Sequence, residues 1–328
     1  MGTAGKTSAF KSFDDSKTSY MANTSVSRQA DDTQSDDTIP DTSIENILSH
    51  TCDFQNKSEI LPEALRHHFR AGGSRTRATL CFNFSRAFGL TAEQAAYMAC
   101  VPELLHNASL IHDDLQDTDE TRRGHASLWK KFGRDIAICA GDFLISAAYK
   151  CAAETKTERL SSLIEATHNH VNDVVKGQID DLSQDKHQTL ADVSTYEQIC
   201  ARKSGALLAM CLTLPLIART DTGNRTQTVP VAKSIFEHYA TAYQICDDLH
   251  DIAADQAKKG QQAAVNIYTV LQQQGNPSPF DAATELAFSH IQKAESLVVQ
   301  LPEPAQDVLH RELANISGRV HRIKKAQQ

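Results

Sequence analysis

Two acidic motifs of the same form stand far apart in this chain. Residues 110–117 read Leu-Ile-His-Asp-Asp-Leu-Gln-Asp, and residues 244–251 read Gln-Ile-Cys-Asp-Asp-Leu-His-Asp. Each follows an apolar stretch of helical spacing, so we expect each at the C-terminal end of a helix. Residues i and i+4 share a helix face, so the first and third aspartates of a motif point the same way, with the second on the flank. The six residues are Asp113, Asp114, Asp117, Asp247, Asp248 and Asp251.

These aspartates predict a metal site. Like charges on one helix face repel each other, and the partly negative C-terminus of a helix adds to the repulsion. Oxygen-only ligands favour Mg²⁺ or another hard ion that holds a phosphate group. One such motif alone is more often a solvated helix end. Two copies after apolar stretches indicate that both face one interior cavity of a helix bundle.

The body of the chain reads as helical. From Ile44 onward apolar residues recur at helical spacing and no run alternates over six residues, which predicts an all-α fold. The expected helices that concern the motifs cover roughly 91–117, 125–131 and 229–253, and Thr91 is a suitable N-cap for the first.

The first 45 of the 328 residues differ in composition from the rest. Residues 1–45 hold fifteen Ser or Thr, eight acidic and four basic side chains. Such a segment buries too little apolar surface to offset its ordering entropy. We therefore expect a disordered arm over 1–45 and one helical domain over 46–328.

Charge and cysteine content exclude several classes of protein. The net charge of −8 leaves no basic surplus, so we expect no nucleic-acid partner. The eight cysteines show no CxxC or CxxH pairing and suit buried thiols in a reducing cytoplasm. The longest apolar stretch, 205–218, contains Pro215 and is shorter than a membrane span, so we expect no spanning helix.

The sequence around the two motifs resembles the trans-isoprenyl diphosphate synthases, also called polyprenyl synthetases. The resemblance runs from about residue 57 to 260, in the family's order and spacing. The segments that carry it are 109–124, 132–133, 140–142, 177–182, 203–207 and 243–248.

This resemblance implies an isoprenoid-synthase-type helical bundle with a deep central cavity and a homodimeric assembly. In that family three Mg²⁺ ions bridge the six aspartates to the diphosphate of an allylic substrate. Neutralising the leaving pyrophosphate lets the allylic C–O bond ionise. The double bond of isopentenyl diphosphate then attacks the cation, and loss of a proton completes a five-carbon extension.

The resemblance also assigns basic and polar side chains to the two diphosphates. Arg122, Lys203 and Gln244 would hold the allylic diphosphate, whereas Arg77, His106 and Arg123 would hold isopentenyl diphosphate. This chain departs from the family in two places. Arg75 could replace a lysine that is Ser74 here. In the altered loop after Asp251, Lys258 or Lys259 could supply a cation to the allylic diphosphate, although both could equally be ordinary helix-end lysines.

The departures leave two other functions open. One is a terpene synthase of isoprenyl-synthase type, which ionises an allylic diphosphate and then cyclises it or quenches it with water. Ser74 and the altered loop favour this function, whereas Arg77, His106 and Arg123 disfavour it. The other is a catalytically silent subunit of a heteromeric synthase, in which aspartates would be lost, but all six are present.

The residues before the first motif predict the product length. By the resemblance, an aromatic side chain five positions before the first aspartate limits products to fifteen carbons. Ala108 stands there, Ser109 follows and Leu105 lies about one turn deeper. We therefore expect products of twenty carbons or more. Ala108→Phe should shorten the product in a chromatographic assay, and an unchanged distribution would place the floor of the cavity elsewhere.

Overall fold

The computed structural model describes residues 41–187, 192–219, 225–257 and 266–327. Its elements in chain order are α1 (Asp41–Thr51), α2 (Ile60–Arg70), α3 (Thr76–Ala87), α4 (Ala92–Gln116), β1 (Thr121–Arg122), β2 (His125–Ala126), α5 (Leu128–Phe132), α6 (Arg134–Glu154), α7 (Leu160–His187), α8 (Val193–Cys200), the π-helix η2 (Ala201–Gly205), α9 (Ala206–Ala218), α10 (Arg225–Ala257), α11 (Ile267–Gln273), α12 (Pro279–Val298) and α13 (Glu303–Ala326).

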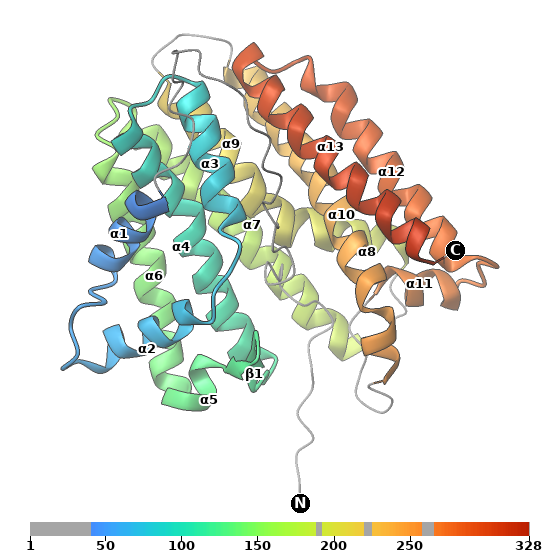
Figure 1. The fold of residues 1–328 in the computed structure, drawn as a ribbon, viewed down its shortest axis with the longest axis horizontal. Helices are drawn as coiled ribbons and strands as arrows, with labels where there is room; N and C mark the ends of the chain where they lie inside the picture. The colour runs from blue at the N-terminus through green and yellow to red at the C-terminus, as the bar shows by residue number, and fades with distance from the viewer. Residues whose placement is uncertain (1–40, 188–191, 220–224, 258–265, 328) are drawn as a thin grey trace, which may run out of the picture.

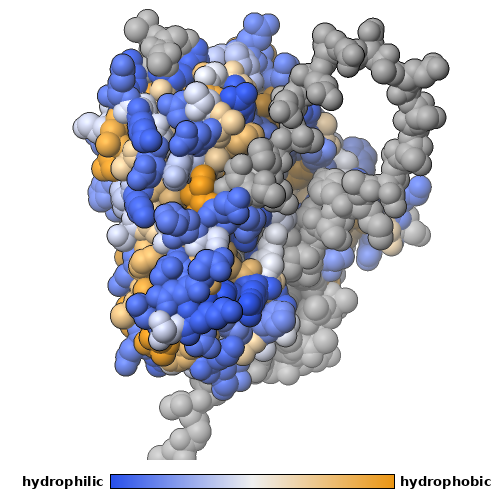
Figure 2. Space-filling view, turned by 60° about the vertical axis from the view of Figure 1, so that its left-hand side comes forward, coloured by the Kyte–Doolittle hydropathy of each residue, from blue (hydrophilic) through white to orange (hydrophobic). Residues whose placement is uncertain are grey.

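The predicted all-α fold is confirmed for the described part of the chain. The strands in this part, β1 and β2, have two residues each and form one antiparallel hairpin. Helix α4 packs between α3 and α6, and α10 packs against α9, η2 and α12. Helices α12 and α13 lie side by side along the right of Figure 1, with α10 beside them. The face on the left of Figure 1 is mostly hydrophilic, with small apolar areas between polar side chains (Figure 2). The helices therefore turn most of their apolar residues inward.

Helix α4 places the first motif. Thr91 and Gln94 form a capping box, in which Thr91 Oγ1 accepts from the Gln94 backbone N–H and the Gln94 side chain accepts from that of Thr91. The helix is buried along most of its length and ends at Asp117, its C-cap. The first motif thus lies at a helix C-terminus, as expected.

Helix α10 differs from the expectation for the second motif. It continues past Asp251 to Ala257, six residues beyond the motif. The segment 252–257 reads Ile-Ala-Ala-Asp-Gln-Ala and contains no glycine or proline, so nothing in it ends the helix. The prediction of a helix end at this motif was therefore wrong.

The hairpin of β1 and β2 was also not predicted from the sequence, since a helix was expected over 125–131. Arg123 and Gly124 have φ angles of 50° and 78°, so both central residues of the two-residue turn are left-handed. This is the geometry of a type I′ turn, which matches the twist of the two flanking strands. Helix α5 then begins only at Leu128. The turn fixes the backbone of both predicted arginines, Arg122 and Arg123.

The N-terminal boundary falls earlier than expected. Helix α1 begins at Asp41 and buries Ile44 and Leu48, so the expected boundary between residues 45 and 46 lies inside this helix. Residues 1–40 lie outside the described part, and disorder of the arm stays a prediction.

Helices α8, η2 and α9 form one continuous helical run. This run, Val193–Ala218, and α6 are long and apolar enough to cross a membrane by length and composition. However, 89% of the apolar window in Val193–Ala218 is buried inside the bundle, as in a core helix, and the value for α6 is 44%. Within the run, η2 carries Lys203, and its backbone lies against Gly177 of α7.

Gly177→Ala should destabilise the fold and displace Lys203. A Cβ at Gly177 would lie 3.1 Å from the Lys203 backbone nitrogen and 3.2 Å from the Arg202 carbonyl carbon, and backbone cannot swing aside. Overpacking of this kind costs about 1–3 kcal/mol.

Chemical denaturation measures the loss, and Gly318→Ala on α13 is the matched control. Its Cβ would meet only the end of Arg322, at 3.5 Å, so this change should stabilise by about 0.5–1 kcal/mol. Equal effects of the two substitutions would contradict the packing argument.

Candidate active site

The first motif buries three carboxylates in little more than one helical turn. The exposed fractions of Asp113, Asp114 and Asp117 are 3%, 1% and 5%. One oxygen of each, namely Asp113 Oδ2, Asp114 Oδ2 and Asp117 Oδ1, is inaccessible to solvent and receives no hydrogen bond. Buried carboxylate oxygens are costly unless a donor or a cation compensates them. The motif therefore requires positive charge beside it.

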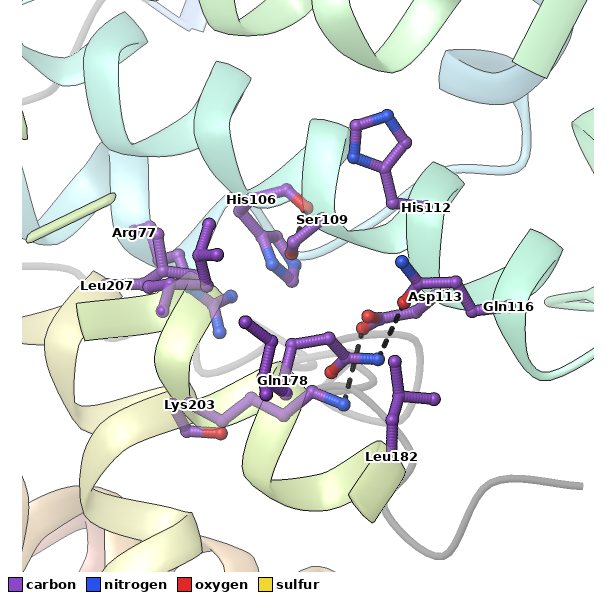
Figure 3. A pocket seen from close by; sticks show the side chains of 14 residues that line it. Arg77, His106, Ser109, His112, Asp113, Gln116, Gln178, Leu182, Lys203 and Leu207 are labelled. Atoms are coloured by element: carbon purple, nitrogen blue, oxygen red, sulfur yellow. Dashed lines mark hydrogen bonds and ion pairs between the residues drawn. The ribbon is translucent and has the colours of Figure 1, made fainter. Parts of the chain in front are cut away.

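Two of the predicted cations lie at this motif. Arg122, on β1, donates from Nε to Asp114 Oδ1 at 2.9 Å, and its Nη2 contacts the same oxygen. Lys203 Nζ lies 3.6 Å from Asp113 Oδ2 (Figure 3).

Lys203 has a second carboxylate partner that sequence reasoning missed. Its Nζ donates to Oδ2 of Asp181, on α7, at 3.0 Å. The available signal was that Asp181 lies in the segment 177–182, which is part of the family resemblance. Its burial is seen only in the structure. Lys203 is thus shared between two carboxylates and neutralises neither fully.

The imbalance appears in the acidities of the motif. Burial raises the pKa of Asp114 to about 6, although the Arg122 charge opposes this. Burial and then the charge of Asp113 raise the pKa of Asp117 to about 7, against the effect of Lys203. Both shifts disfavour the ionised form and are those expected where a cation is missing.

The donor set fits a hard divalent ion such as Mg²⁺. Three carboxylate oxygens without hydrogen-bond donors are the ligand type that Mg²⁺ prefers. Within the described ranges, no three His, Cys, Asp or Glu side chains already surround a common point. An ion bound here would therefore take further ligands from water or from a phosphate group.

The second motif is built differently, because Asp248 is hydrogen-bonded on both oxygens. Tyr196 Oη donates to Asp248 Oδ2 at 2.8 Å, and the backbone N–H of Ile267 donates to the same oxygen at 2.9 Å. Gln244 Nε2 donates to Oδ1 at 2.9 Å. Burial raises the pKa of Asp248 to about 7, although these three hydrogen bonds oppose the shift.

Asp248 therefore joins α8, α10 and α11. Gln244 holds this carboxylate, and its predicted contact with phosphate stays a prediction. Sequence reasoning missed Tyr196 and Ile267 because both belong to other helices.

Asp247 has a partner from the far end of the chain. Nη2 of Arg319, on α13, donates to Asp247 Oδ1, and the guanidinium carbon lies 4.7 Å from the ring centroid of Tyr243. The predicted residues Asp251, for its side chain, and Lys258 fall outside the described part, so their roles stay predictions.

A cavity of about 160 Å³ lies between α4, α7, η2 and α9, with Arg77 of α3 at one side (Figure 3). The cavity brings together five predicted residues: Arg77, His106, Ser109, Asp113 and Lys203. Burial and then the Arg77 charge hold the pKa of His106 well below its usual value, so the imidazole is neutral. The other walls of the cavity are largely apolar. They come mainly from α7, with Val174, Val175, Ile179 and Leu182, and from α9, with Leu207.

The predicted chain-length residues separate in the structure. Ser109 lines the cavity and its hydroxyl donates to the His106 carbonyl at 2.8 Å. Ala108 and Leu105 are buried, but neither is among the lining residues.

Arg123 is fitted against the glycine loop before α3. A Cβ at Gly73 would lie 2.7 Å from Arg123 Nη1, and the φ of Gly73 is +155°. The absence of a side chain at Gly73 therefore lets the hairpin bring Arg123 onto this loop.

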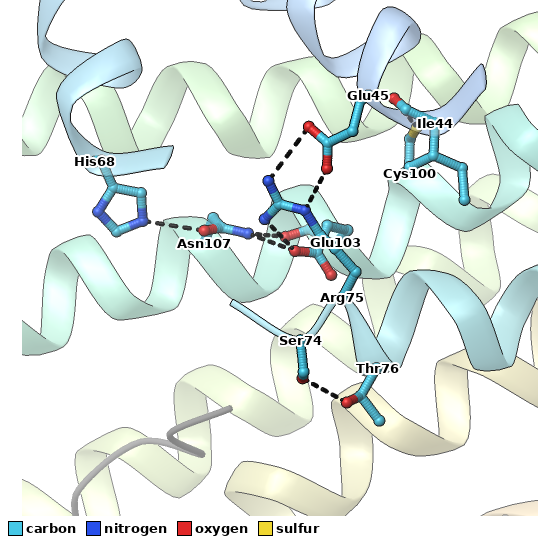
Figure 4. Close-up of polar contacts among 9 residues, drawn as sticks. All are labelled: Ile44, Glu45, His68, Ser74, Arg75, Thr76, Cys100, Glu103 and Asn107. Carbon is cyan, nitrogen blue, oxygen red and sulfur yellow. Dashed lines mark hydrogen bonds and ion pairs between the residues drawn. The ribbon is translucent and has the colours of Figure 1, made fainter. Parts of the chain in front are cut away.

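Arg75 is held away from a substrate role in this structure. Its Nε donates to Glu45 Oε1 at 2.7 Å and its Nη1 to Glu103 Oε1 at 3.0 Å (Figure 4). Ser74, at the position of the family lysine, instead pairs with the Thr76 hydroxyl at 2.6 Å. A cationic replacement for that lysine by Arg75 stays a prediction.

The Arg75 network extends through α4 to α2. Asn107 Nδ2 donates to Glu103 Oε1 at 3.1 Å, and His68 Nε2 lies 3.0 Å from Asn107 Oδ1 (Figure 4). Burial lowers the pKa of His68 to about 3, so the imidazole is neutral. The chain of contacts ties α1, α2 and α4 to Arg75, the N-cap of α3.

Comparison with known proteins agrees with this site. The sequence model of the polyprenyl synthetase family matches residues 58–269, which is well over half of the chain. The chain belongs to the polyprenyl synthetase family. Its relatives carry prenyltransferase names, and the chain is a member of this enzyme class, the trans-prenyltransferases.

Three relatives illustrate the range within the polyprenyl synthetase family. A dimethylallyltranstransferase of Fischerella ambigua is 33% identical over 210 residues, which cover 62% of this chain and 60% of that protein. A farnesyl diphosphate synthase of Bacillus subtilis is 27% identical over 291 residues, covering 85% and 95%. The crystal structure of a geranylgeranyl pyrophosphate synthetase from Pyrococcus horikoshii superposes with a TM-score of 0.71 at 26% identity, covering 84% and 95%.

Asp117→Asn should change how the stability of the metal-free protein depends on pH. The folded pKa of about 7 lies above the unfolded value of 3.8, so the folded state retains the proton longer. The corresponding stability is fully present below about pH 4 and is lost as the pH rises through about 7. Removing this carboxyl should raise the melting temperature relative to wild type more at pH 8 than at pH 5.

Thermal melts in the presence of a chelator measure this difference. Asp135→Asn, an exposed change on α6, is the matched control. An Asp117→Asn difference that is equal at the two pH values would contradict the assignment.

Proposed function

We propose that this chain condenses an allylic diphosphate with isopentenyl diphosphate to form a prenyl diphosphate of twenty carbons or more. One observation carries the proposal: three buried carboxylate oxygens without hydrogen-bond donors lie beside Lys203 and Arg122, and one of these acids, Asp113, lines a largely apolar cavity together with Lys203. Such a site suits a metal-bound diphosphate joined to a hydrocarbon chain.

The proposed cofactor is Mg²⁺, with three ions once substrate is bound, held by the six predicted aspartates. When bound, the ions supply charge that neutralises the diphosphate as it leaves. The protein side chains supply fixed cations. Lys203 and Arg122 stand next to Asp113 and Asp114 and can donate to diphosphate oxygens that the ions leave uncovered.

In this proposal, isopentenyl diphosphate binds on the other side of the cavity. Arg77 and His106 line it, and Arg123 lies at the neighbouring Gly73 loop. The neutral His106 ring offers one N–H donor and no charge, so the two arginines would carry the electrostatic attraction. The apolar side chains of α7 and α9 exclude water from the allylic cation.

The product length is proposed from the size of the residues on α4. The relatives include a farnesyl and a geranylgeranyl diphosphate synthase, so family membership alone leaves fifteen and twenty carbons open. The small side chain of Ser109 lines the cavity next to the first motif and leaves space there, which favours the longer product, whereas Ala108 does not line this cavity.

A terpene synthase that acts on an allylic diphosphate alone is the second candidate. The contacts of Arg75 favour it, because the guanidinium that could replace the family lysine is bound by Glu45 and Glu103. The second diphosphate pocket is then one cation short.

We further propose a homodimer that does not span a membrane and works in the cytoplasm. All eight cysteines are free, and seven are buried, which suits a reducing compartment. The apolar run Val193–Ala218 is packed in the bundle and is not needed as a membrane anchor.

Purified protein should incorporate labelled isopentenyl diphosphate into a longer prenyl diphosphate in the presence of Mg²⁺ and an allylic diphosphate. Asp113→Asn should lower turnover by about 10²- to 10³-fold, because it removes charge that holds the ions at the leaving group. Asp119→Asn, two residues beyond the motif, is the matched control and should keep most of the activity. Formation of unlabelled hydrocarbons or alcohols from the allylic substrate alone would contradict the transferase and support the terpene synthase.

A further inference from the structure

The C-terminal helix α13 brings a guanidinium to the second aspartate motif. Arg319 Nη2 donates to Asp247 Oδ1 across 72 residues of sequence. The side chains of Arg319 and Asp247 are only 20% and 17% exposed. The guanidinium also stacks over Tyr243, one turn before Asp247 on α10. This ion pair is thus a packed contact between α10 and α13 and is not a chance meeting of surface charges.

The contact between Arg319 and Asp247 costs less to break than the hydrogen bonds of Asp248. Asp248 accepts three hydrogen bonds from the protein, and losing them would leave buried donors without acceptors. Arg319 contacts Asp247 through Nη2, while its Nη1 is buried without a hydrogen-bond partner. A contact through one nitrogen is weaker than the two-point fork that arginine can form.

A divalent ion and this guanidinium compete for the same oxygen. Mg²⁺ binds carboxylate oxygens at about 2.1 Å, so an ion on Asp247 Oδ1 would stand beside the guanidinium that now occupies this oxygen. The two cations repel each other strongly at such distances in a partly buried site. An ion that takes Asp247 Oδ1 would therefore displace the guanidinium from this oxygen.

We propose that Arg319 is a positioning residue, which holds Asp247 while the second motif is metal-free and is displaced when a divalent ion binds there. The inference rests on the proposed function, which places an ion at this motif. The first motif, with its uncompensated oxygens, is then ready for an ion, whereas the second binds one only after α13 releases Asp247. Metal binding at the second motif is thereby coupled to the C-terminal helix.

Mn²⁺ binding, followed by electron paramagnetic resonance without any substrate, tests this coupling. Arg319→Met keeps the bulk of the side chain and removes its charge, so one class of Mn²⁺ site should bind about five- to tenfold more tightly than in wild type. The melting temperature without metal should fall, and the rise on adding Mn²⁺ should grow.

Lys325→Met is the matched control, because it removes the same charge from an exposed position on α13. Arg319→Lys keeps a charge without the planar contact, so its affinity should lie between wild type and Arg319→Met. If Arg319→Met does not fold, Arg319→Lys decides.

Mn²⁺ affinities in both Arg319 variants equal to that of Lys325→Met, or weaker than wild type, would overturn the proposal. Because no substrate is present, this result is independent of the product assay. A protein that makes no prenyl diphosphate but shows the tighter Mn²⁺ site would refute the proposed function alone.

Discussion

The uncompensated negative charge at the C-terminal end of α4 governs the arrangement of the site. Asp113, Asp114 and Asp117 are buried there beside helix carbonyls that are themselves partly negative. The hairpin turn brings Arg122, and the π-helix brings Lys203, but Lys203 also neutralises Asp181. Two cations, one of them shared, against four acids leave a deficit of positive charge. The proposed divalent ion with a phosphate ligand would remove that deficit.

The two aspartate motifs have the same sequence form but different physical roles. The first stands at a helix end and presents oxygens without donors. The second lies inside α10, where α8, α11 and α13 all pack against it, so Asp248 and Asp247 already have protein partners. A carboxylate with a raised pKa and three hydrogen bonds contributes to the framework as much as to ligand binding. Identical residue types therefore acquire distinct functions from the helices packed around them.

The sequence was informative where chemistry is local and less so where it depends on packing. The helical spacing gave the fold class, and the acidic motifs with the adjoining Arg122 gave the first half of the site. Helical periodicity could not find the turn at Arg123 and Gly124, whose left-handed angles override it. The partners of Asp247 and Asp248 come from helices whose contacts no short pattern encodes. Arg319 reads as an ordinary basic residue near the end of a helix until α13 is placed beside α10.

The missing lysine at Ser74 shows how the fold limits the chemistry of the second diphosphate pocket. Arg75 could reach a substrate only by leaving Glu45 and Glu103, and Glu103 would then remain as a buried acid without its cation. Breaking a buried ion pair by removing one partner costs several kcal/mol, about 3–5, so the arginine is retained by the fold.

In the proposed reaction, an Arg75 that stays with Glu45 and Glu103 would leave Arg77 and Arg123 to attract the second diphosphate, since His106 is neutral. This loss would weaken binding of the second substrate but would leave the first motif, and hence the proposed ionisation of the allylic diphosphate, unchanged. A transferase with a high KM for isopentenyl diphosphate would have a weak second site and an intact first site. A terpene synthase would have the same combination. The difference between these two enzymes therefore lies in the occupancy of one pocket and not in the aspartates.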